Sequence, residues 1–402
     1  MTRLDVGRDD LFGLHNLPYG VYSRAGAAGA AGAAGAARPE RRVATRYGDH
    51  VVDLAMLLGE EVFATGSLNP FMAQGPERWA EVRGRIADAL RGDVPDEAVH
   101  ALAEVELHLP FEVADYVDFY ASEHHATNLG RLFRPDGAPL MPNWKHLPVG
   151  YHGRSGSIVV SGTDVVRPAG QLGAGAFGPS QRLDIEAEVG FVVGVGNRMG
   201  DPVAVEDAER HLFGVVLFND WSARDIQAWE YVPLGPNLGK SFASTISPWV
   251  VPLLALGAAR VDTPVQDPPV LPYLALDRPW GLDLELEVSW NGDVVSRPPY
   301  AAMYWSPAQM LAHLTVNGAP TRTGDLFASG TVSGPEKEQR GAFIELTWGG
   351  AEPIAVGAEK RTFLQDGDEV VITASAPGPD GSRIGFGEAR GRILPHPTKA
   401  GA

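Results

Sequence analysis

Residues 183–193 read Leu183-Asp-Ile-Glu-Ala-Glu-Val-Gly-Phe-Val-Val193, with acidic and apolar side chains alternating over the first half. Alternation with a period of two predicts a β-strand whose apolar face packs into a core. The opposite face would carry Asp184, Glu186 and Glu188, three carboxylates that repel one another. A solvated acidic strand is the alternative, but Asp and Glu are poor strand formers. We therefore expect a hard divalent cation with oxygen ligands on this face.

Composition places the chain among globular proteins. It has 402 residues, 44% hydrophobic and 21% charged, enough for a large core and a smaller domain. The formal net charge of -17 argues against binding to nucleic acid or to an anionic membrane. Because the chain has no Cys, thiolate metal sites and a cysteine nucleophile are excluded. The N-terminus lacks the apolar core of a signal peptide, and no apolar stretch is long enough to span a membrane, so we expect a cytoplasmic protein.

The chain is expected to divide near Pro110. Strands at 42–47 and 50–54 and an amphipathic helix at 77–90 predict a small first domain, which includes a Gly/Ala tract at 25–37 expected to be a surface loop. Later residues form short apolar runs separated by Gly and Pro, which indicates a predominantly β domain. Strands are expected there at 157–161, 212–219, 249–252 and 369–373, and a capped helix at 306–317.

Two glycine-rich segments resemble nucleotide-binding loops without matching them. Residues 194–200 have the wrong final spacing for a dinucleotide fingerprint, and Pro202 follows where a helix should start, so we expect a turn. Residues 235–241 have three residues between their glycines where a phosphate-binding loop has four. Neither segment predicts a nucleotide site.

A first group of polar residues follows the apolar run that ends at Asp220. Ser222 and Asp225 have the spacing of a variant capping box, which predicts that a helix starts here. A cation, an amide and a phenol would share one face of this helix: Arg224, Gln227 and Tyr231. An exposed polar face is the alternative, but Asp220 at the strand end favours a functional site.

A second group surrounds two adjacent histidines. Ser122 can cap a short helix that Gly130 ends, with His124 and His125 in its first turn. The helix dipole there disfavours imidazolium, which keeps a neutral base available near pH 7. A lone histidine is more often structural. Asp118 and Tyr120, just before this helix, could supply a metal ligand and a hydrogen-bond donor.

Several longer motifs then resemble the fumarylacetoacetase family over nearly the whole chain: Asp118-Phe-Tyr120, His125-Ala-Thr-Asn, Tyr151-His-Gly-Arg, Asn219-Asp-Trp-Ser-Ala-Arg224-Asp-Ile-Gln227, Leu238-Gly-Lys240-Ser-Phe, Gly330-Thr331-Val-Ser-Gly and Ile344-Glu345-Leu-Thr-Trp. The resemblance implies a mainly β (α+β) fold. It implies a small N-terminal SH3-like β-barrel domain at 1–110, then a C-terminal mixed β-sandwich roll at 111–402 that holds the active site. It also implies a homodimer.

The resemblance further implies a Ca²⁺ site formed by four carboxylates: Asp118, Glu186, Glu188 and Asp220. It associates Mg²⁺ with Asp220, Lys240 and Ser244. A protonated ammonium cannot coordinate a cation, so only the backbone carbonyl of Lys240 could be a ligand. Ser244 stands where the family has Thr and keeps the hydroxyl. Asp184 is not a ligand in the family pattern, which leaves it to pair with another group or to meet solvent.

The substrate implied is a small diketo acid, 4-fumarylacetoacetate, cleaved to fumarate and acetoacetate in the last step of tyrosine and phenylalanine catabolism. The substrate contacts carried over are Tyr120, Arg134, Tyr151, Gln227, Tyr231 and Thr331. His125, oriented by Glu345, would activate a water molecule. Three residues would stabilise the oxyanion that forms: Arg224, Gln227 and Lys240.

The sequence leaves two other functions open. The first is a related enzyme with a similar metal site, such as an acylpyruvase or an isomerase or decarboxylase of ring catabolism. The second is a calcium-stabilised binding module without catalysis, which would leave His125 and Glu345 without a purpose.

Overall fold

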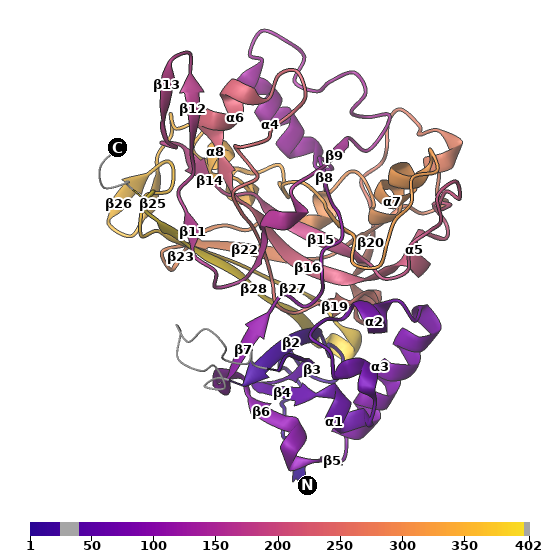
Figure 1. Ribbon diagram of the computed structural model, residues 1–402. Coiled ribbons are helices and arrows are strands. Elements are labelled where there is room, and N and C mark those ends of the chain that lie inside the picture. The colour runs from indigo at the N-terminus through magenta and orange to yellow at the C-terminus, as the bar shows by residue number, and fades with distance from the viewer. Residues whose placement is uncertain (25–39, 398–402) are drawn as a thin grey trace.

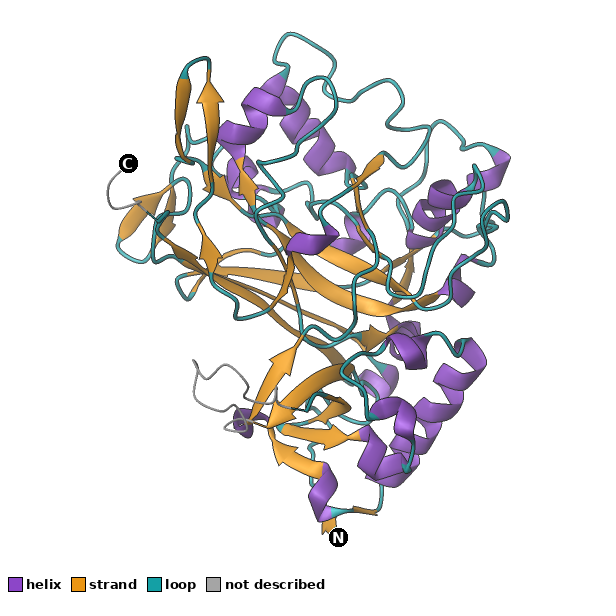
Figure 2. Ribbon diagram, in the orientation of Figure 1, coloured by secondary structure: helices purple, strands orange, loops and turns teal. Residues whose placement is uncertain are grey.

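A computed structural model describes residues 1–24 and 40–397, so the expected loop at 25–37 lies outside the described residues. The chain is mainly β, as predicted, with a smaller N-terminal part below a larger C-terminal part in the view shown (Figures 1 and 2). No helix that the structure describes is long and apolar enough to cross a membrane.

The N-terminal part is built on an antiparallel sheet with the strand order β6-β4-β3-β2-β7. Its strands are β2 (Tyr19–Arg24), β3 (Arg42–Tyr47), β4 (His50–Asp53), β6 (Val99–Ala101) and β7 (Val105–His108). Beside them lie a short pair, β1 (Thr2–Arg3) and β5 (Asp93–Val94), and the helices α1 (Leu54–Leu58), α2 (Asn69–Met72) and α3 (Pro76–Leu90). The strands and the long helix predicted in this part are confirmed. The boundary near residue 110 stays a proposal.

The C-terminal part contains two larger sheets. The first has the order β10-β18-β16-β15-β24-β8-β9, with β19 paired to β16, and mixes parallel and antiparallel pairs. Its strands are β8 (Tyr116–Phe119), β9 (Gly150–His152), β10 (Ile158–Val160), β15 (Ala187–Val193), β16 (Leu212–Asp220), β18 (Ser244–Ile246), β19 (Val251–Pro252) and β24 (Leu326–Ala328). The second, in the order β11-β28-β27-β22-β23, contains β11 (Val165–Val166), β22 (Glu285–Trp290), β23 (Asp293–Ser296), β27 (Glu369–Pro377) and β28 (Arg383–Leu394).

Short helices and hairpins surround these sheets (Figure 1). The helices are α4 (Glu123–Phe133), α5 (Ala208–His211), α6 (Arg224–Glu230), α7 (Pro307–Thr315) and α8 (Phe343–Leu346). The paired short strands are β12 (Ala169–Gly173) with β13 (Ala176–Pro179), β14 (Leu183–Asp184) with β17 (Ser222–Ala223), β20 (Arg260–Asp262) with β21 (Trp280–Leu282), and β25 (Ile354–Val356) with β26 (Glu359–Arg361). Helix α7 has the predicted cap, because the Ser306 side chain accepts a hydrogen bond from the Gln309 N–H.

The first large sheet is buried on both faces. In β16, Val215 and Leu217 belong to the core shared with the second sheet, whereas Val216 and Phe218 belong to the core shared with the N-terminal part. A strand covered on both sides should read as a continuous apolar run, which is the sequence of β16. The N-terminal part therefore covers the face of this sheet that the acidic residues share.

The two parts are joined by close backbone contact. Tyr19 and Val250 exchange backbone hydrogen bonds of 2.9 and 2.7 Å. A Cβ atom on Gly20 would lie 2.6 Å from the Trp249 ring, so only glycine permits this approach. The cover over the acidic face is therefore part of a continuous packed structure.

Three local predictions need correction. The single strand expected at 183–193 is divided into β14 and β15, because β14 pairs with β17 while β15 pairs with β16. Ser222 does not cap α6: its hydroxyl donates to the Asp220 carbonyl, and Ala223 is the capping residue. Gly130 does not end α4, which continues to Phe133. A Cβ at Gly130 would lie 1.8 Å from the Pro139 carbonyl oxygen, so glycine is required by that contact.

Candidate metal centre and active site

Three carboxylates converge on the covered face of the first large sheet: Asp118 on β8, Glu188 on β15 and Asp220 at the end of β16. One oxygen of each lies within 4.8 Å of the others, and all three side chains are buried. The alternation of side chains between the two faces of each strand explains why these carboxylates lie together. Tyr116 and Phe218, two residues before Asp118 and Asp220, lie in the core under the N-terminal part, so the two acids point the same way.

The electrostatics of this group favour a bound cation. Burial raises the pKa of Asp118, and the charge of Asp220 adds to that effect against the opposing charge of Arg154. Burial and the neighbouring carboxylates also raise the pKa of Glu188 well above its ordinary value. Glu188 Oε2 accepts a hydrogen bond of 3.1 Å from the Gly330 N–H, whereas the buried Oε1 accepts none from the described residues. A buried carboxylate oxygen without a partner is costly, and a cation would satisfy it.

Two buried cations already contact the carboxylates. Arg154 Nη2 lies 2.6 Å from Asp118 Oδ2 and 2.6 Å from Asp220 Oδ2. Lys240 Nζ lies 2.7 Å from Asp220 Oδ2 and contacts Glu186 Oε2. The ammonium of Lys240 is therefore turned toward the acids.

The charges in this region can be counted directly. Five buried acids, Asp118, Asp184, Glu186, Glu188 and Asp220, surround three buried bases, Arg154, Arg224 and Lys240. These eight residues have a formal net charge of -2, which favours a bound cation, and the buried Glu345 carboxylate lies outside this count. Carboxylate oxygens are the ligands of hard divalent ions, so the donor set fits such an ion.

Two other predicted metal residues lie next to the group of three. Glu186 Oε1 is 2.8 Å from Arg224 Nη1, while its Oε2 contacts Lys240. Burial alone would raise the pKa of Glu186, but these two cations lower it. Ser244 Oγ donates a 2.8 Å hydrogen bond to Asp220 Oδ1. The roles of Glu186, Lys240 and Ser244 as ligands stay predictions.

A histidine–carboxylate pair joins two helices, with His125 on α4 and Glu345 on α8. His125 Nδ1 is 2.6 Å from Glu345 Oε2, and both side chains are buried. Ser122 caps α4 as predicted, accepting a hydrogen bond from the His125 N–H at 3.2 Å. The cap fixes the first turn of the helix and with it the direction of the imidazole.

Glu345 is held by further polar groups that the sequence reasoning missed. Asn128 Nδ2 donates to Glu345 Oε1 at 2.9 Å, and Ser333 Oγ donates to Oε2 at 2.9 Å. Burial alone would raise the pKa of Glu345, but His125 and these hydrogen bonds lower it, so the group is a carboxylate at neutral pH. Asn128 could have been found from its spacing, because residues three apart on one helix, as His125 and Asn128 are, lie on the same face.

Three of the predicted substrate residues approach the metal and histidine groups. The Tyr120 ring meets His125 edge to face at 5.4 Å between centroids. Tyr151 donates a 2.9 Å hydrogen bond from its hydroxyl to Asp118 Oδ2. Gln227 Oε1 accepts a 3.0 Å hydrogen bond from Arg224 Nη1, which leaves its amide donors available.

The other three lie around these groups with unused polar atoms or exposed surface. Arg134 donates from Nη2 to the Pro139 carbonyl at 2.8 Å, and its Nε has no partner among the described residues. Thr331 Oγ1 is buried without a partner among the same residues. Tyr231 follows the end of α6 with 39% of its surface exposed. All six contacts with substrate stay predictions.

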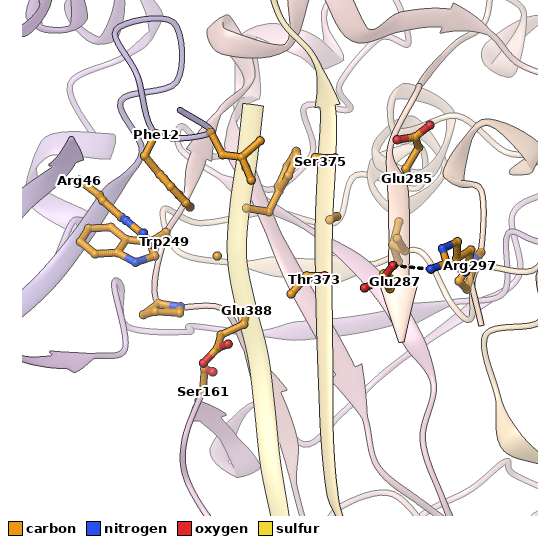
Figure 3. A pocket seen from close by; sticks show the side chains of 18 of the residues that line it. Phe12, Arg46, Ser161, Trp249, Glu285, Glu287, Arg297, Thr373, Ser375 and Glu388 are labelled. Atoms are coloured by element: carbon orange, nitrogen blue, oxygen red, sulfur yellow. Dashed lines mark ion pairs between the residues drawn. The ribbon is translucent and has the colours of Figure 1, made fainter. Parts of the chain in front are cut away.

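A large groove lies elsewhere and contains none of the predicted site residues. Its volume is about 1130 Å³, and Phe12 and Arg46 of the N-terminal part face Thr373 and Glu388 of the second sheet across it (Figure 3). No histidine is among the residues that line this groove, and its acidic residues are not members of the buried carboxylate group. The buried carboxylates and the histidine pair define the site better.

Arg154 belongs to the motif Tyr151-His-Gly-Arg, from which no role was predicted for it. Its backbone is left-handed, with φ 55°, which costs a non-glycine residue about 1 kcal/mol. Its side chain is only 5% exposed and bridges Asp118 and Asp220. The local strain and the burial both indicate that the position of this guanidinium matters for the site.

We expect Arg154→Met to reduce the free energy of unfolding of the metal-free protein by about 3 kcal/mol, because it leaves two buried carboxylates without their shared cation. Urea denaturation with and without Ca²⁺ measures the loss, which should be smaller when the ion is present. Arg392→Met is the matched control. Arg392 pairs with Glu369 at 3.2 Å with 55% of its side chain exposed, so its loss should cost less than about 1 kcal/mol. Equal losses in the two variants would contradict the prediction.

A mainly β fold with a buried three-carboxylate group beside a carboxylate-held histidine defines a class, the metal-binding hydrolases. Family models agree with this class. Residues 15–110 match the model described as Fumarylacetoacetase N-terminal, and residues 115–394 match Fumarylacetoacetate (FAA) hydrolase C-terminal. The chain belongs to the fumarylacetoacetate hydrolase family.

Curated relatives and solved structures agree with the family. The fumarylacetoacetase of Homo sapiens is 45% identical over 426 residues, covering 98% of this chain and 99% of the relative. That of Caenorhabditis elegans is 46% identical over 423 residues, covering 98% of each. The structure of a fumarylacetoacetate hydrolase from Exiguobacterium antarcticum, at 18% identity, has a TM-score of 0.58 and covers 94% of this chain and all of the other. At that identity the structural similarity shows the fold alone.

Proposed function

We propose that this chain hydrolyses a carbon–carbon bond of 4-fumarylacetoacetate, giving fumarate and acetoacetate, the last step of tyrosine and phenylalanine catabolism. The observation that carries the proposal is the buried His125–Glu345 pair, held at 2.6 Å beside the carboxylate group. Relatives named fumarylacetoacetase that are 43% to 46% identical over nearly the whole chain support the choice of substrate.

His125 is the proposed base. The Glu345 carboxylate accepts a hydrogen bond from Nδ1–H, which places the lone pair of the neutral ring on Nε2. Nε2 can then take a proton from a water molecule as that water attacks a carbonyl carbon of the substrate. The resulting imidazolium is stabilised by Glu345, and His125 can return the proton to the departing carbon atom.

The oxyanion formed by the attack needs donors that are already in place. Arg224 is buried with its guanidinium fixed by Asp184, Glu186 and Gln227, so little reorganisation is needed. Gln227 and Lys240 are proposed to supply further donors. Arg134 is proposed to bind a carboxylate of the substrate through its guanidinium.

The residues proposed to hold the metal are Asp118, Glu186, Glu188 and Asp220 for Ca²⁺, with Lys240 and Ser244 associated with Mg²⁺. When bound, a divalent ion supplies Lewis acidity toward the two carbonyl oxygens of a β-diketone and stabilises negative charge on them. The carboxylates would fix its position, while Arg154 and Lys240 would balance part of their charge. A homodimeric state and a cytoplasmic location, both expected from the sequence, belong to this proposal.

The test is the ultraviolet absorbance of fumarylacetoacetate mixed with purified protein. We expect the absorbance to fall in the presence of Ca²⁺ or Mg²⁺, at least about 100-fold faster than after chelation, because loss of the metal removes its Lewis acidity. Adding the ion back after chelation should restore the rate. An absorbance that stays constant with metal-replete protein would defeat the proposal, and cleavage only of other diketo acids would favour a related acylpyruvase.

A further inference from the structure

We propose that Asp184 is a positioning residue that holds Glu345 and Arg224 in their working places at the same time. Its catalytic consequence rests on the function proposed above. Asp184 lies in β14, is fully buried, and has no place among the expected metal ligands. The role follows from the groups that its two oxygens contact.

Each oxygen of Asp184 accepts two hydrogen bonds. Oδ1 accepts from the backbone N–H groups of Ile185 and Phe343, both at 2.8 Å. Oδ2 accepts from the Ile344 N–H at 3.1 Å and from Arg224 Nε at 2.8 Å. One buried carboxylate therefore joins three separate segments of the chain.

The contacts with Phe343 and Ile344 fix the start of α8. These are the first two residues of the helix, whose N–H groups have no partner within it. Glu345 is the next residue, so the place where the helix begins determines where its carboxylate lies. Through this helix, Asp184 sets the position of the group that orients His125.

The contact with Arg224 fixes the other half of the site. Asp184 binds Nε, while Nη1 faces Glu186 and Gln227, each from a different direction. The guanidinium plane is thereby defined by partners on two edges. A shift of Asp184 would move Arg224 and α8 together, and the proposed base and the proposed oxyanion donor would be displaced at once.

A carboxylate is required for this set of contacts. All four partners of Asp184 are donors, and a carboxylate has lone pairs for four of them without any hydrogen of its own. An amide at the same place would point its N–H₂ group at donors and leave some of them unpaired. We therefore expect Asp184→Asn to disturb both contacts although its shape is nearly the same.

The first measurement is steady-state kinetics of Asp184→Asn. We expect kcat to fall roughly 30- to 100-fold while KM changes less than about threefold, because the groups affected act on the transition state. Asp368→Asn is the matched control. Asp368 is also buried and accepts hydrogen bonds from the Gln365 N–H, from Asn291 and from Arg361, and none of these partners is a predicted site residue. It should lose stability and keep kcat. Equal kcat losses in both variants would overturn the proposal.

The second measurement is a double-mutant cycle with Glu345→Gln. If Asp184 acts through Glu345, Asp184→Asn should cost much less in the Glu345→Gln background than in the wild type. Multiplicative losses would overturn the proposal. Asp184→Ser, which removes the carboxylate without adding an amide, should give the same result and serves if the Asn variant does not fold.

The third measurement does not depend on turnover. The short bond between His125 Nδ1 and Glu345 should give a strongly downfield proton signal in the NMR spectrum. We expect Asp184→Asn to abolish it and Asp368→Asn to keep it. A wild-type protein that shows the signal, loses it in the variant and does not cleave the substrate would defeat the proposed function alone. An unchanged signal in Asp184→Asn would overturn the role of Asp184.

Discussion

His125→Ala is expected to lower kcat about 10³-fold while the affinity for Ca²⁺ stays within a factor of about three. The loss follows from removing the proposed general base, since proton transfer by a positioned side chain contributes about 10² to 10⁴ in rate. Metal binding should survive because no carboxylate of the group of three depends on the imidazole: Asp118, Glu188 and Asp220 are fixed by strands and by other partners.

His124→Ala provides a close control. It removes the same side chain from the same helical turn, but His124 is partly exposed, whereas His125 is 2% exposed and bonded to Glu345. Its kcat should stay within about threefold of the wild type. Stopped-flow absorbance gives kcat, and isothermal titration with Ca²⁺ gives the affinity. Near-normal turnover in His125→Ala would refute the base assignment, and loss of metal binding would place His125 in the metal site.

Much of the fold could be predicted from local patterns. The strand at 212–219, the capped helix at 306–317 and the strand at 369–373 each have a strong local signal, and each is found within a few residues. The break at Ile185–Glu186 had no such signal. The chain passes there from pairing with β17 to pairing with β16, and partner strands distant in sequence decide that change.

Those residues of the candidate site that stand in a recognisable local sequence pattern could be predicted. Asp220 at a strand end and His125 behind the Ser122 cap could be picked out from their neighbours. Arg154 and Asp184 could not, because their importance lies in partners that are distant along the chain. Asp184 contacts residues 159 and 160 positions away, and the sequence left it either to pair with a group that no pattern named or to meet solvent.

No pattern in the sequence predicted that the acidic face would be covered. An alternating strand predicts one packed face, but β15 is buried at every position: Val192 lies in the core under the N-terminal part, and Glu188 lies in the buried carboxylate group. Neighbouring carboxylates that are buried repel one another more strongly than solvated ones, so they require cations close to them. A bound metal ion should therefore contribute to the stability of the protein.

We expect Glu188→Gln to be more stable than the wild type in the absence of metal and less stable than the wild type when metal is bound. In the metal-free protein, burial and the charges of Asp118, Glu186 and Asp220 disfavour ionised Glu188, so neutralising it should raise the free energy of unfolding by about 1 kcal/mol. With metal the wild type should be the more stable. We expect the affinity of Glu188→Gln for the metal ion to be at least about 100-fold lower than that of the wild type. At an ion concentration of about 100 times the wild-type Kd, the stabilisation then drops from about 2.7 kcal/mol to about 0.4 kcal/mol.

Asp325→Asn separates this effect from the removal of any buried acid. Asp325 is also buried, has a pKa raised by burial, and has an oxygen, Oδ1, that forms no hydrogen bond among the described residues and only a 3.5 Å ion pair with the exposed Arg322, but it is not a member of the carboxylate group. Urea denaturation of the three proteins in chelator and in Ca²⁺ should show the order crossing only for Glu188→Gln. A variant that still gains the full 2.7 kcal/mol from Ca²⁺ would show that the ion binds elsewhere. A metal-free variant less stable than the wild type would mean that Glu188 is not under electrostatic stress, because repulsion relieved by the substitution must appear as added stability.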